Sequence, residues 1–313
     1  MKRILITPRS LTRNPDPALE ALVEDGYQLV FSSAGKTPDE AALLDLLPGC
    51  VGWLAGVEPV SSRVLESASD LRVISRNGTG TDNLPLDVAG RLGIQVLRAA
   101  GANARGVAEL AIGLMLASLR HVPEQSAALK AGNWERRPGL EIEGRTLGLI
   151  GCGAVGRLVA RFALALDARV RVFDPFPDAG FMPEGEFAWA SLEQVLEEAD
   201  LLSLHCPLPA DGRALLDQSV IGRMRQGCHV VNTARAALVD EDAMLAALET
   251  GHVRVYATDV FAAEPPAPSR LLAHPRVIAT PHIGGLTAES VHRATVAAVD
   301  NLREALRNQP TTR

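Results

Sequence analysis

The chain has 313 residues, of which 47% are hydrophobic and 22% are charged, so it can bury sizeable cores and is not intrinsically disordered. At about 100–200 residues per domain, this length predicts two domains. The formal net charge of −6 argues against a nucleic-acid-binding protein, whose phosphate contacts need a basic face. It leaves open a small anionic ligand, which needs only a local cluster of cations.

No membrane segment or secretory signal is expected. The longest apolar stretch, residues 107–119, contains Glu109 and is shorter than the roughly 20 residues that a bilayer requires. The apolar run near the N-terminus is shorter than the core of a signal peptide, about 7–15 residues. Four cysteines beside strand-like runs lie far apart and form no C-x-x-C pair, which predicts reduced, buried thiols: Cys50, Cys152, Cys206 and Cys228. These features favour a cytoplasmic protein.

Short apolar runs alternate with helical stretches along the chain. A first set of five runs spans residues 3–7, 28–32, 50–55, 71–75 and 94–97. A second set of six spans residues 146–151, 169–174, 201–205, 229–232, 255–258 and 277–279. Most are rich in Val, Ile and Leu without polar alternation, which is typical of parallel strands buried on both faces. The alternation therefore predicts an α/β fold with right-handed crossovers.

Residues 104–120 connect the two sets of runs. Apolar side chains recur there at helical spacing, at Val107, Leu110, Ala111, Leu114 and Met115. This pattern predicts a buried helix. Residues 132–144, which include Trp134, are expected to form an irregular arm. Residues 287–307 are again helical, and their position predicts a return to the first domain, with a substrate cleft between two domains joined by two connections.

A glycine-rich segment, Gly151-Cys152-Gly153-Ala154-Val155-Gly156, follows the strand-like run 146–150 and precedes a helical stretch, 157–166. Strand, glycines and helix in this order are typical of a dinucleotide-binding turn. Gly151 allows the tight turn, Gly153 lets the backbone approach a pyrophosphate, and Gly156 permits close packing of helix on strand. The N–H groups of the helix N-terminus can bind the phosphates, and Ala154 and Val155 of the motif are expected to contact the cofactor.

The choice of dinucleotide rests on Asp174, which ends the next strand 18 residues after Gly156. Its carboxylate can accept hydrogen bonds from the adenosine ribose hydroxyls and would repel a 2′-phosphate. The following Pro175 and Phe176 offer no cation to such a phosphate. The sequence therefore predicts NAD rather than NADP.

Further motifs occur in a fixed order along the chain. They are SRNGTGTDNL at 75–84, NARGVAEL at 103–110, GRTLGLIGCGAVG at 144–156, HCPLP at 205–209, VVNTARAALVDE at 230–241, ATDVFAAEPP at 257–266 and TPHIGG at 280–285. In these motifs the chain resembles the D-isomer-specific 2-hydroxyacid dehydrogenase family, in its D-3-phosphoglycerate dehydrogenase-like branch. The resemblance implies two doubly wound parallel-sheet domains. A Rossmann-type NAD-binding domain, residues 102–286, is inserted into a flavodoxin-like substrate domain, residues 1–101 plus 287–313. It also implies an enzyme without a C-terminal regulatory domain, because the chain ends after the returning helix.

The resemblance implies that Arg235, Glu264 and His282 carry the chemistry. Each follows a predicted strand, where open parallel sheets place their ligands. Arg235 offers a planar fork to the substrate carboxylate. His282 is the general acid in reduction of a 2-keto acid and the base in oxidation of the hydroxy acid. Glu264 would hold the imidazole ring and favour its protonated form.

Other motif positions receive binding roles from the same resemblance. The expected cofactor contacts are Pro207, Thr233, Ala234, Asp259, Gly284 and Gly285. The expected substrate loop is Gly78, Thr79 and Gly80, whose N–H groups can form an anion-binding nest. Ala236 stands where the family commonly has glycine, which would narrow the pocket or shift its loop. His205 and Cys206 are adjacent with no third ligand nearby, so no metal site is expected.

The sequence predicts an NAD-dependent oxidoreductase that interconverts a small D-2-hydroxy acid and its 2-keto acid. A hydroxypyruvate or glyoxylate reductase with the same machinery is the alternative enzyme, and a non-enzymatic NAD-sensing corepressor or scaffold is the alternative of another class. A homodimer is expected through the helix 104–120 and the arm around Trp134, the region through which the family commonly dimerises.

The loop after the third strand, residues 55–60, bears on the substrate. It holds no Lys or Arg and carries Glu58, whereas phosphoglycerate-type relatives bind the substrate phosphate partly with basic residues there. If Glu58 faces the substrate, a phosphorylated acid is disfavoured. If Glu58 points to solvent, it decides nothing.

Overall fold

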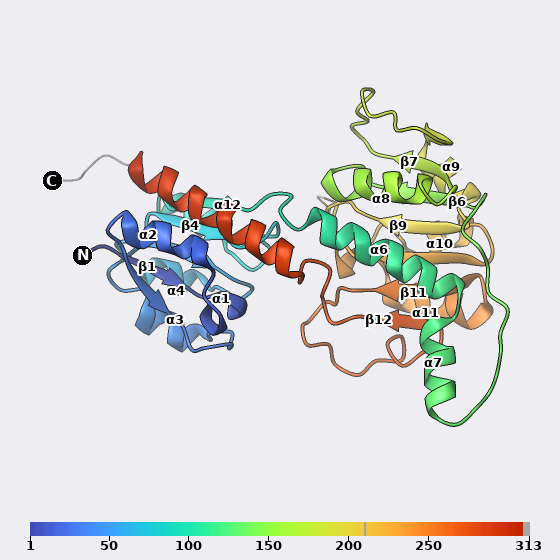
Figure 1. Ribbon diagram of the computed structural model, residues 1–313, viewed down its shortest axis with the longest axis horizontal. Coiled ribbons are helices and arrows are strands. Elements are labelled where there is room, and N and C mark those ends of the chain that lie inside the picture. The colour runs from blue at the N-terminus through green and yellow to red at the C-terminus, as the bar shows by residue number, and fades with distance from the viewer. Residues whose placement is uncertain (210, 309–313) are drawn as a thin grey trace. The chain divides into compact units, whose positions relative to one another are not determined.

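The computed structural model describes residues 1–209 and 211–308 and divides the chain into two compact units. Unit 1 combines residues 1–103 with the chain from residue 285 onward, and unit 2 comprises residues 104–284 (Figure 1). Within the described residues, no helix is both long enough and apolar enough to cross a membrane.

Unit 1 contains a five-stranded parallel sheet in the order β2-β1-β3-β4-β5. Its strands are β1 Arg3–Ile6, β2 Gln28–Phe31, β3 Cys50–Ala55, β4 Val73–Arg76 and β5 Gln95–Arg98. Its helices are α1 Arg9–Arg13, η1 Pro17–Leu19, α2 Glu20–Glu24, α3 Glu40–Leu46, α4 Ser62–Ser67, α5 Leu86–Arg91 and α12 Ala288–Arg307.

Successive residues of β1 point to opposite faces of this sheet, so both faces are buried. Ile4 and Ile6 pack in one cluster with Leu302 of α12. Leu5 packs on the other face in a cluster with Trp53 and Leu43. The helix from the C-terminal part of the chain thus completes the core that the first hundred residues begin.

Unit 2 contains a seven-stranded parallel sheet in the order β12-β11-β10-β9-β6-β7-β8. Its strands are β6 Thr146–Ile150, β7 Arg169–Phe173, β8 Phe187–Trp189, β9 Leu201–Leu204, β10 Cys228–Asn232, β11 Val253–Thr258 and β12 Val277–Ala279. Its helices are α6 Ala104–Leu119, α7 Val122–Lys130, α8 Ala154–Leu164, α9 Leu192–Glu198, α10 Gln218–Arg223, η2 Ala236–Leu238 and α11 Glu241–Thr250. The order reverses between β6 and β9, which is the topological switch point of a doubly wound sheet.

The predicted α/β fold with parallel strands is confirmed, and every strand expected from the apolar runs is present. The sequence missed β8, an edge strand of three half-buried residues. It also missed α7, because no residue of that helix is buried and so no apolar stripe marks it. The helix expected at 157–166 begins at Ala154, within the glycine motif itself.

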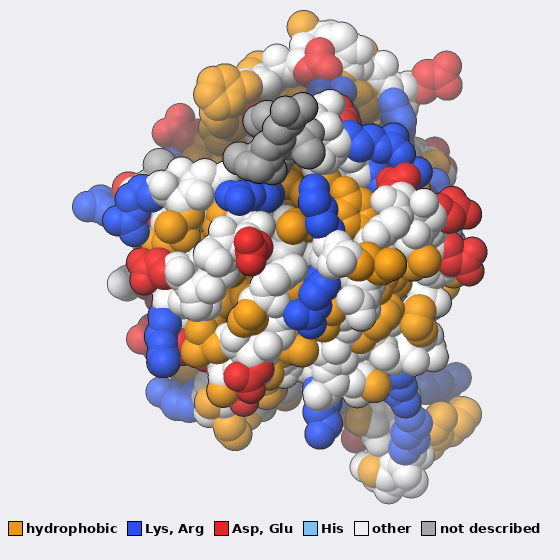
Figure 2. Space-filling model, turned by 90° about the vertical axis from the view of Figure 1, so that its left-hand side faces the viewer, with side chains coloured by type: hydrophobic (Ala, Val, Ile, Leu, Met, Phe, Trp, Pro, Cys, Tyr) orange, Lys and Arg blue, Asp and Glu red, His pale blue; other side chains and the backbone are white. Residues whose placement is uncertain are grey.

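The surface carries charges of both signs. Figure 2 shows one face of the molecule, on which basic and acidic side chains are interspersed among apolar ones. Such mixing, together with the net charge of −6, provides no broad basic surface on that face for nucleic acid.

Candidate active site

The predicted residues of unit 2 lie in loops at the carboxyl edge of its sheet. Strand pairing sets Asn232 of β10 opposite Thr258 of β11, and Thr258 opposite Ala279 of β12. These three strands therefore end level with one another. The loops that follow them carry Arg235, Glu264 and His282 respectively, so three separate segments deliver the expected catalytic side chains to one edge.

The glycine turn connects β6 to α8, and its three glycines stand at positions with different steric requirements. Gly151 adopts φ +97°, and a Cβ there would meet the His205 carbonyl at 2.6 Å. A Cβ on Gly156 would collide with the Gly151 carbonyl oxygen. At Gly153, by contrast, φ is −74° and a Cβ would meet nothing within 4 Å. Neither the backbone nor the packing requires glycine at 153, which fits a site where a ligand approaches the chain.

Asp174 lies at the carboxyl end of β7 and is held in place by backbone groups. Its Oδ2 accepts a hydrogen bond from the N–H of Cys152 at 2.8 Å, and its Oδ1 accepts one from the N–H of Phe176 at 2.9 Å. These bonds fix the carboxylate beside the glycine turn and leave lone pairs for ribose hydroxyls. The neighbouring Arg157 forms an ion pair with Asp178 at 2.8 Å, so its charge is already balanced.

The turn after β10 is braced by Asn232. Its Oδ1 accepts the Ala234 N–H at 3.1 Å, and its Nδ2 donates to the Arg235 carbonyl at 2.8 Å. The Arg235 guanidinium donates to the Ala234 carbonyl at 2.8 Å. Thr233, in the same turn, is buried, and its Oγ1 has no hydrogen-bond partner within the described chain. A buried hydroxyl without a partner is costly, and a bound ligand would satisfy it.

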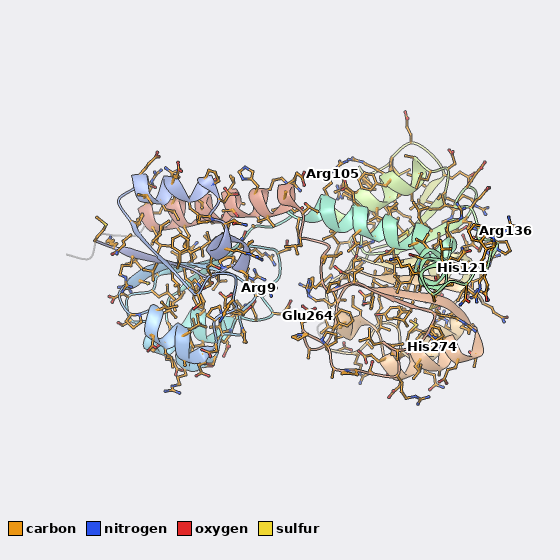
Figure 3. The ribbon with its side chains drawn as sticks, turned by 60° about the horizontal axis from the view of Figure 1, so that its bottom comes forward. Arg9, Arg105, His121, Arg136, Glu264 and His274 are labelled. Atoms are coloured by element: carbon orange, nitrogen blue, oxygen red, sulfur yellow. The ribbon has the colours of Figure 1, made fainter. Side chains whose placement is uncertain are left out.

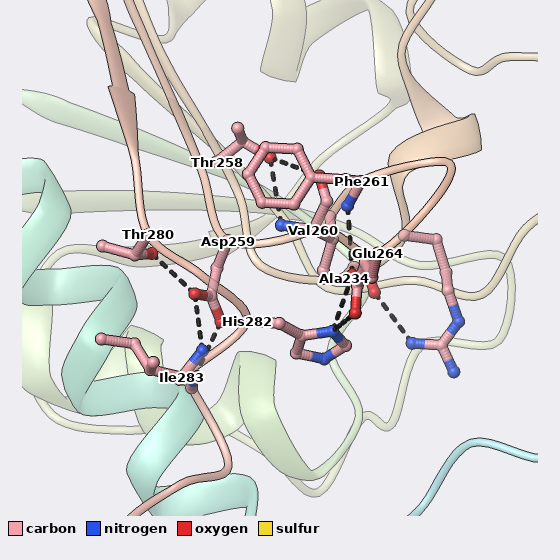
Figure 4. A network of polar contacts seen from close by, with 11 residues as sticks. Ala234, Thr258, Asp259, Val260, Phe261, Glu264, Thr280, His282 and Ile283 are labelled. Atoms are coloured by element: carbon pink, nitrogen blue, oxygen red, sulfur yellow. Dashed lines mark hydrogen bonds and ion pairs between the residues drawn. The ribbon is translucent and has the colours of Figure 1, made fainter. Parts of the chain in front are cut away.

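His282 and Glu264 form a close pair (Figure 4). The His282 Nδ1 lies 2.8 Å from Glu264 Oε1 and 2.7 Å from Oε2. The Phe261 N–H donates to Glu264 Oε1 at 3.3 Å, which steadies the carboxylate. Because the carboxylate takes Nδ1, Nε2 on the far side of the ring is left to exchange a proton with a ligand.

Asp259 organises the loop that carries His282 (Figure 4). Its side chain is 1% exposed and accepts hydrogen bonds from Thr280 Oγ1 at 2.6 Å, from the Ile283 N–H at 2.8 Å and from the Gly284 N–H at 2.7 Å. These bonds surround His282, whose φ of +53° lies in the left-handed region that costs a non-glycine residue about 1 kcal/mol or more. The carboxylate of Asp259 thus holds a strained backbone in place.

The two glycines after His282 are explained by packing. A Cβ on Gly284 would lie 3.0 Å from Asp259 Oδ2. A Cβ on Gly285 would lie 2.9 Å from Asn103 Nδ2. Both contacts are with side-chain ends, so a Cβ at either position would require Asp259 or Asn103 to shift.

The expected substrate loop, Gly78 to Gly80, belongs to unit 1 and follows β4. Gly78 adopts φ +154°, and its carbonyl accepts the Ala99 N–H at 3.1 Å. Thr79 is exposed, and its hydroxyl donates to Asn103 Oδ1 at 3.2 Å. This loop is therefore anchored at Gly78 and Thr79 to other parts of unit 1. Pro207, expected at the cofactor, is exposed in the loop after β9 of unit 2.

Both readings of Glu58 were wrong. Glu58 is 1% exposed, so it does not point to solvent, and its carboxylate is engaged within unit 1. It accepts a hydrogen bond from the Thr7 hydroxyl and one from the Gly56 N–H at 2.8 Å. Trp53 Nε1 in turn donates to Thr7 Oγ1 at 2.9 Å. The carboxylate therefore braces the loop after β3 and is not presented to a ligand.

Ala236 fits without backbone strain. It begins η2 and is absent from the described non-glycine residues with positive φ, which are His121, Asp167 and His282. An alanine at this position therefore needs no special conformation, and the shift expected from the missing glycine has no backbone cause.

His205 is neutral at physiological pH. Burial lowers its pKa to about 4, and its Nε2 lies 2.9 Å from Ser203 Oγ. Burial also raises the pKa of Cys152 to about 11 and raises the pKa of Cys206. Among the residues that the structure describes, no three His, Cys, Asp or Glu side chains gather as a metal site.

Sequence reasoning missed the residues that hold the site together. Thr280 and Asn232 contact no expected ligand group, yet they fix Asp259 and the turn before Arg235. Thr280 lies 21 positions from Asp259, so only the pairing of β11 with β12 brings the two together. Thr280 lies in the motif TPHIGG, and Asn232 lies in the motif VVNTARAALVDE. These motifs were the only sequence signal that could have drawn attention to the two residues.

Comparison with known proteins identifies the chain's relatives. Residues 112–284 match the model of the D-isomer specific 2-hydroxyacid dehydrogenase, NAD binding domain. The chain is 38% identical to the hydroxypyruvate reductase of Thermotoga maritima over 252 residues, which cover 79% of this chain and 81% of the relative. The chain belongs to the D-isomer specific 2-hydroxyacid dehydrogenase family.

Two further relatives show the range of this family. The chain is 32% identical to the D-3-phosphoglycerate dehydrogenase of Bacillus subtilis over 93% of its own length but only 54% of that protein. It thus spans about half the length of the phosphoglycerate dehydrogenases that it matches. A glyoxylate reductase from Paecilomyes thermophila has a similar structure, with a TM-score of 0.84, 27% identity and coverage of 98% and 96% of the two chains.

The family assignment makes the chain an NAD-dependent oxidoreductase that acts on CH–OH groups. The residues present fit NAD. The open space at Gly153, the oriented carboxylate of Asp174 and the unpartnered hydroxyl of Thr233 all lie at the carboxyl edge of the sheet in unit 2. Gly153 and Asp174 would contact the pyrophosphate and the adenosine ribose, and Thr233 would line the cofactor.

Proposed function

We propose that the chain reduces a small 2-keto acid to its D-2-hydroxy acid, with Arg235, Glu264 and His282 as the catalytic residues. The observation that carries this proposal is the Glu264–His282 pair, in which both carboxylate oxygens lie within 2.8 Å of Nδ1. When bound, NADH supplies the hydride. His282 delivers a proton from Nε2 to the forming alkoxide, and the Glu264 carboxylate stabilises the imidazolium.

Arg235 would bind the substrate carboxylate with its guanidinium fork. The braced turn from Asn232 to Arg235 supports this role, because the backbone on which the side chain stands is fixed at two points. Thr79 and Gly80 of unit 1 would offer backbone N–H groups to an anionic substrate, whereas the Gly78 N–H already donates to the Arg76 carbonyl at 2.8 Å. Asp259 would keep His282 in position, because its buried carboxylate accepts three hydrogen bonds from the loop around that residue.

We further propose that the preferred substrate has an uncharged tail, as hydroxypyruvate and glyoxylate do. The loop at 55–60 supports this choice, because it holds no Lys or Arg and its one charged group, Glu58, is buried and hydrogen-bonded. The 38% identity to a hydroxypyruvate reductase points the same way.

A phosphorylated acid is the second candidate, and Arg9 is the observation that favours it. Arg9 begins α1 directly after the carboxyl end of β1 (Figure 3). The order of the sheet in unit 1 reverses between β1 and β3, so this end lies at its switch point. The side chain is exposed, and no ion pair with another described residue neutralises it. It could offer a cation to a phosphate where the loop after β3 offers none.

Oxidation of NADH with a panel of 2-keto acids tests these proposals. We expect kcat/KM for hydroxypyruvate or glyoxylate to exceed that for phosphohydroxypyruvate. If phosphohydroxypyruvate is preferred by tenfold or more, and Arg9→Ala removes that preference, the second candidate is correct. If no acid is reduced although NADH binds tightly, the chain is an NAD-sensing scaffold rather than an enzyme.

We also propose a homodimer formed through α6, α7 and the following arm. Large apolar side chains are exposed along this surface, at Leu116, Val122, Leu129 and Trp134, the last with 79% of its surface accessible. A C2 dimer is the commonest symmetric assembly and would cover them. The cytoplasm is the proposed compartment, because all four cysteines are free.

A further inference from the structure

Two more charged side chains lie beside the glycine turn of unit 2, in addition to Asp174. Asp178 stands in the exposed loop between β7 and β8, four residues after Asp174. Its Oδ2 accepts a hydrogen bond from Arg157 Nη2 at 2.8 Å. Arg157 belongs to α8 and directly follows Gly156 of the glycine motif. One cation and two carboxylates therefore gather at the end of the turn where the adenosine ribose is expected.

The backbone of Cys152 shows how near these charges are to one another. Its N–H donates to Asp174 Oδ2 at 2.8 Å, and its carbonyl accepts from Arg157 Nε at 3.2 Å. The N–H and C=O of one residue are joined through a single Cα, so the carboxylate and the guanidinium are neighbours. Burial raises the pKa of the Cys152 thiol to about 11, Arg157 acts against this shift, and Asp174 and Asp178 add to it. All three charges thus lie within electrostatic reach of one residue.

Arg157 is also held by an aromatic ring. Its guanidinium carbon lies 5.1 Å from the centroid of the Phe181 ring, which is a cation–π distance. Phe181 is buried and packs edge-on against Phe187 of β8, with 5.5 Å between the ring centroids. The guanidinium therefore has a fixed place beside Asp174, and this place does not depend on Asp178 alone.

Asp178 is fixed by its own loop. Its Oδ1 accepts a hydrogen bond from the Gly180 N–H at 2.9 Å, and its carbonyl accepts one from the Phe181 N–H at 2.9 Å. The bonds from the Gly180 N–H and from Arg157 lower the pKa of the Asp178 carboxyl below its usual value, so the group is ionised at neutral pH. Asp178 therefore sets a full negative charge against the guanidinium.

A phosphate on the 2′ position of the ribose would meet this arrangement unfavourably. Such a phosphate carries a charge of about −1.5 to −2 at neutral pH. Proteins that accept NADP commonly place an arginine near the ribose to bind it. This chain has an arginine beside Asp174, but Asp178 neutralises that arginine and adds a negative charge of its own.

We propose that Asp178 is a second determinant of the choice of NAD over NADP, because it occupies the arginine that a 2′-phosphate would otherwise bind. Asp174 faces the ribose directly, whereas Asp178 acts through Arg157. Loss of Asp174 alone therefore gives only partial acceptance of the phosphate, since Arg157 stays paired. This proposal concerns the dinucleotide and does not depend on which 2-keto acid the chain reduces.

Isothermal titration calorimetry on the full chain, with ADP-ribose and 2′-phospho-ADP-ribose as probes, tests this proposal. Both probes lack nicotinamide, so they report binding without hydride transfer. Asp178→Asn keeps an oxygen for the Gly180 N–H and turns its NH₂ group toward Arg157, which releases the guanidinium. In an Asp174→Ala background, Asp178→Asn should tighten binding of 2′-phospho-ADP-ribose by about five- to tenfold and leave the affinity for ADP-ribose unchanged.

Two further variants make the result specific. Arg157→Ala, added to Asp174→Ala and Asp178→Asn, should remove the gain, because no guanidinium is left at this position to bind the phosphate. Glu193→Gln controls for the loss of one negative charge. It neutralises the carboxylate of another exposed ion pair of unit 2, with Arg223 at 2.8 Å, and should change neither affinity.

The proposal is overturned if Asp178→Asn leaves the affinity for 2′-phospho-ADP-ribose unchanged or weakens both probes equally. Equal weakening would make Asp178 a structural support of the glycine turn. The proposal is also overturned if the gain survives Arg157→Ala, or if Glu193→Gln produces the same gain. A chain that shows the expected selectivity but reduces no 2-keto acid would refute the proposed reductase activity and leave the role of Asp178 intact.

Discussion

Asp259→Asn removes one acceptor from the most connected side chain of the candidate site. The carboxylate takes two hydrogen bonds on Oδ1 and one on Oδ2. An asparagine that keeps its oxygen at the Oδ1 position turns its NH₂ group toward the buried Gly284 N–H, so two donors face each other. The lost charge-assisted bond and the unsatisfied N–H together cost about 2–5 kcal/mol.

This cost should appear in both stability and catalysis. For a unit of this size, about 2–4 °C are lost per kcal/mol, so the midpoint of thermal unfolding should fall by roughly 5–15 °C. The loop that holds His282 at φ +53° is released, and a displacement of about 1 Å can lower kcat by about 10²-fold. Thermal unfolding followed by circular dichroism, and keto-acid reduction at saturating NADH, measure the two effects.

Asp45→Asn provides the matched control, since Asp45 is exposed on α3 and makes no hydrogen bond or ion pair with another described residue. It should leave both measurements unchanged. If Asp259→Asn unfolds at the wild-type temperature, the carboxylate does not hold the loop. If stability is unchanged but NADH affinity falls, its main role is direct contact with the cofactor.

Five further changes test other parts of the site and the fold. His282→Ala should lower kcat by about 10²–10⁴-fold with NADH affinity retained, and unchanged turnover would remove the proposed role of His282. Glu264→Gln should move the pH optimum of keto-acid reduction downward, because the neutral amide stabilises the imidazolium less. An unmoved pH profile would remove the role of Glu264. Asp174→Ala should weaken NAD binding by about 1.5–3 kcal/mol and relax discrimination against NADP, and a wild-type enzyme that prefers NADPH would contradict the assignment. Trp134→Ser should shift a dimer toward monomer in light scattering, whereas a wild-type monomer at micromolar concentration would refute the dimer. Burial lowers the pKa of His229 to about 4. Between about pH 6.5 and 4 the unfolded chain therefore binds a proton that the folded chain does not. The free energy of unfolding should fall as the pH is lowered across that window. His229→Asn should flatten this fall in urea titrations, and a pH dependence identical to that of the wild type would show that folding does not lower the pKa of His229.

The sequence predicted the strands well because each is a short apolar run that must be buried on both faces. It failed at β8 and α7, where the physical signal is weak. Phe187 and Trp189 of β8 are only half-buried at the edge of the sheet. Leu129 of α7 is 56% exposed, so the helix contributes no core stripe within unit 2. Elements that bury little leave little pattern in a sequence.

Glu58 shows a second limit. A lone carboxylate in a loop is usually solvated, and nothing in residues 55–60 signals otherwise. Its burial depends on Thr7, which lies 51 positions away and comes alongside only because β1 pairs with β3. The partner that makes a buried charge tolerable is supplied by the tertiary fold, so the environment of Glu58 could not be read from its own segment.

The same reasoning separates two kinds of site residue in this protein. Arg235, Glu264 and His282 were expected from the resemblance to the family, and a reaction on a 2-keto acid would use them as the cation, the partner of the proton donor and the proton donor. Asp259, Thr280 and Asn232 hold the backbones on which those groups stand, and no step of the chemistry asks for them by type. A left-handed histidine persists only where its surroundings over-determine it, and here a carboxylate 23 residues earlier in the chain does so with three hydrogen bonds. Loss of such a support should therefore lower kcat while every group that acts on the substrate is still present.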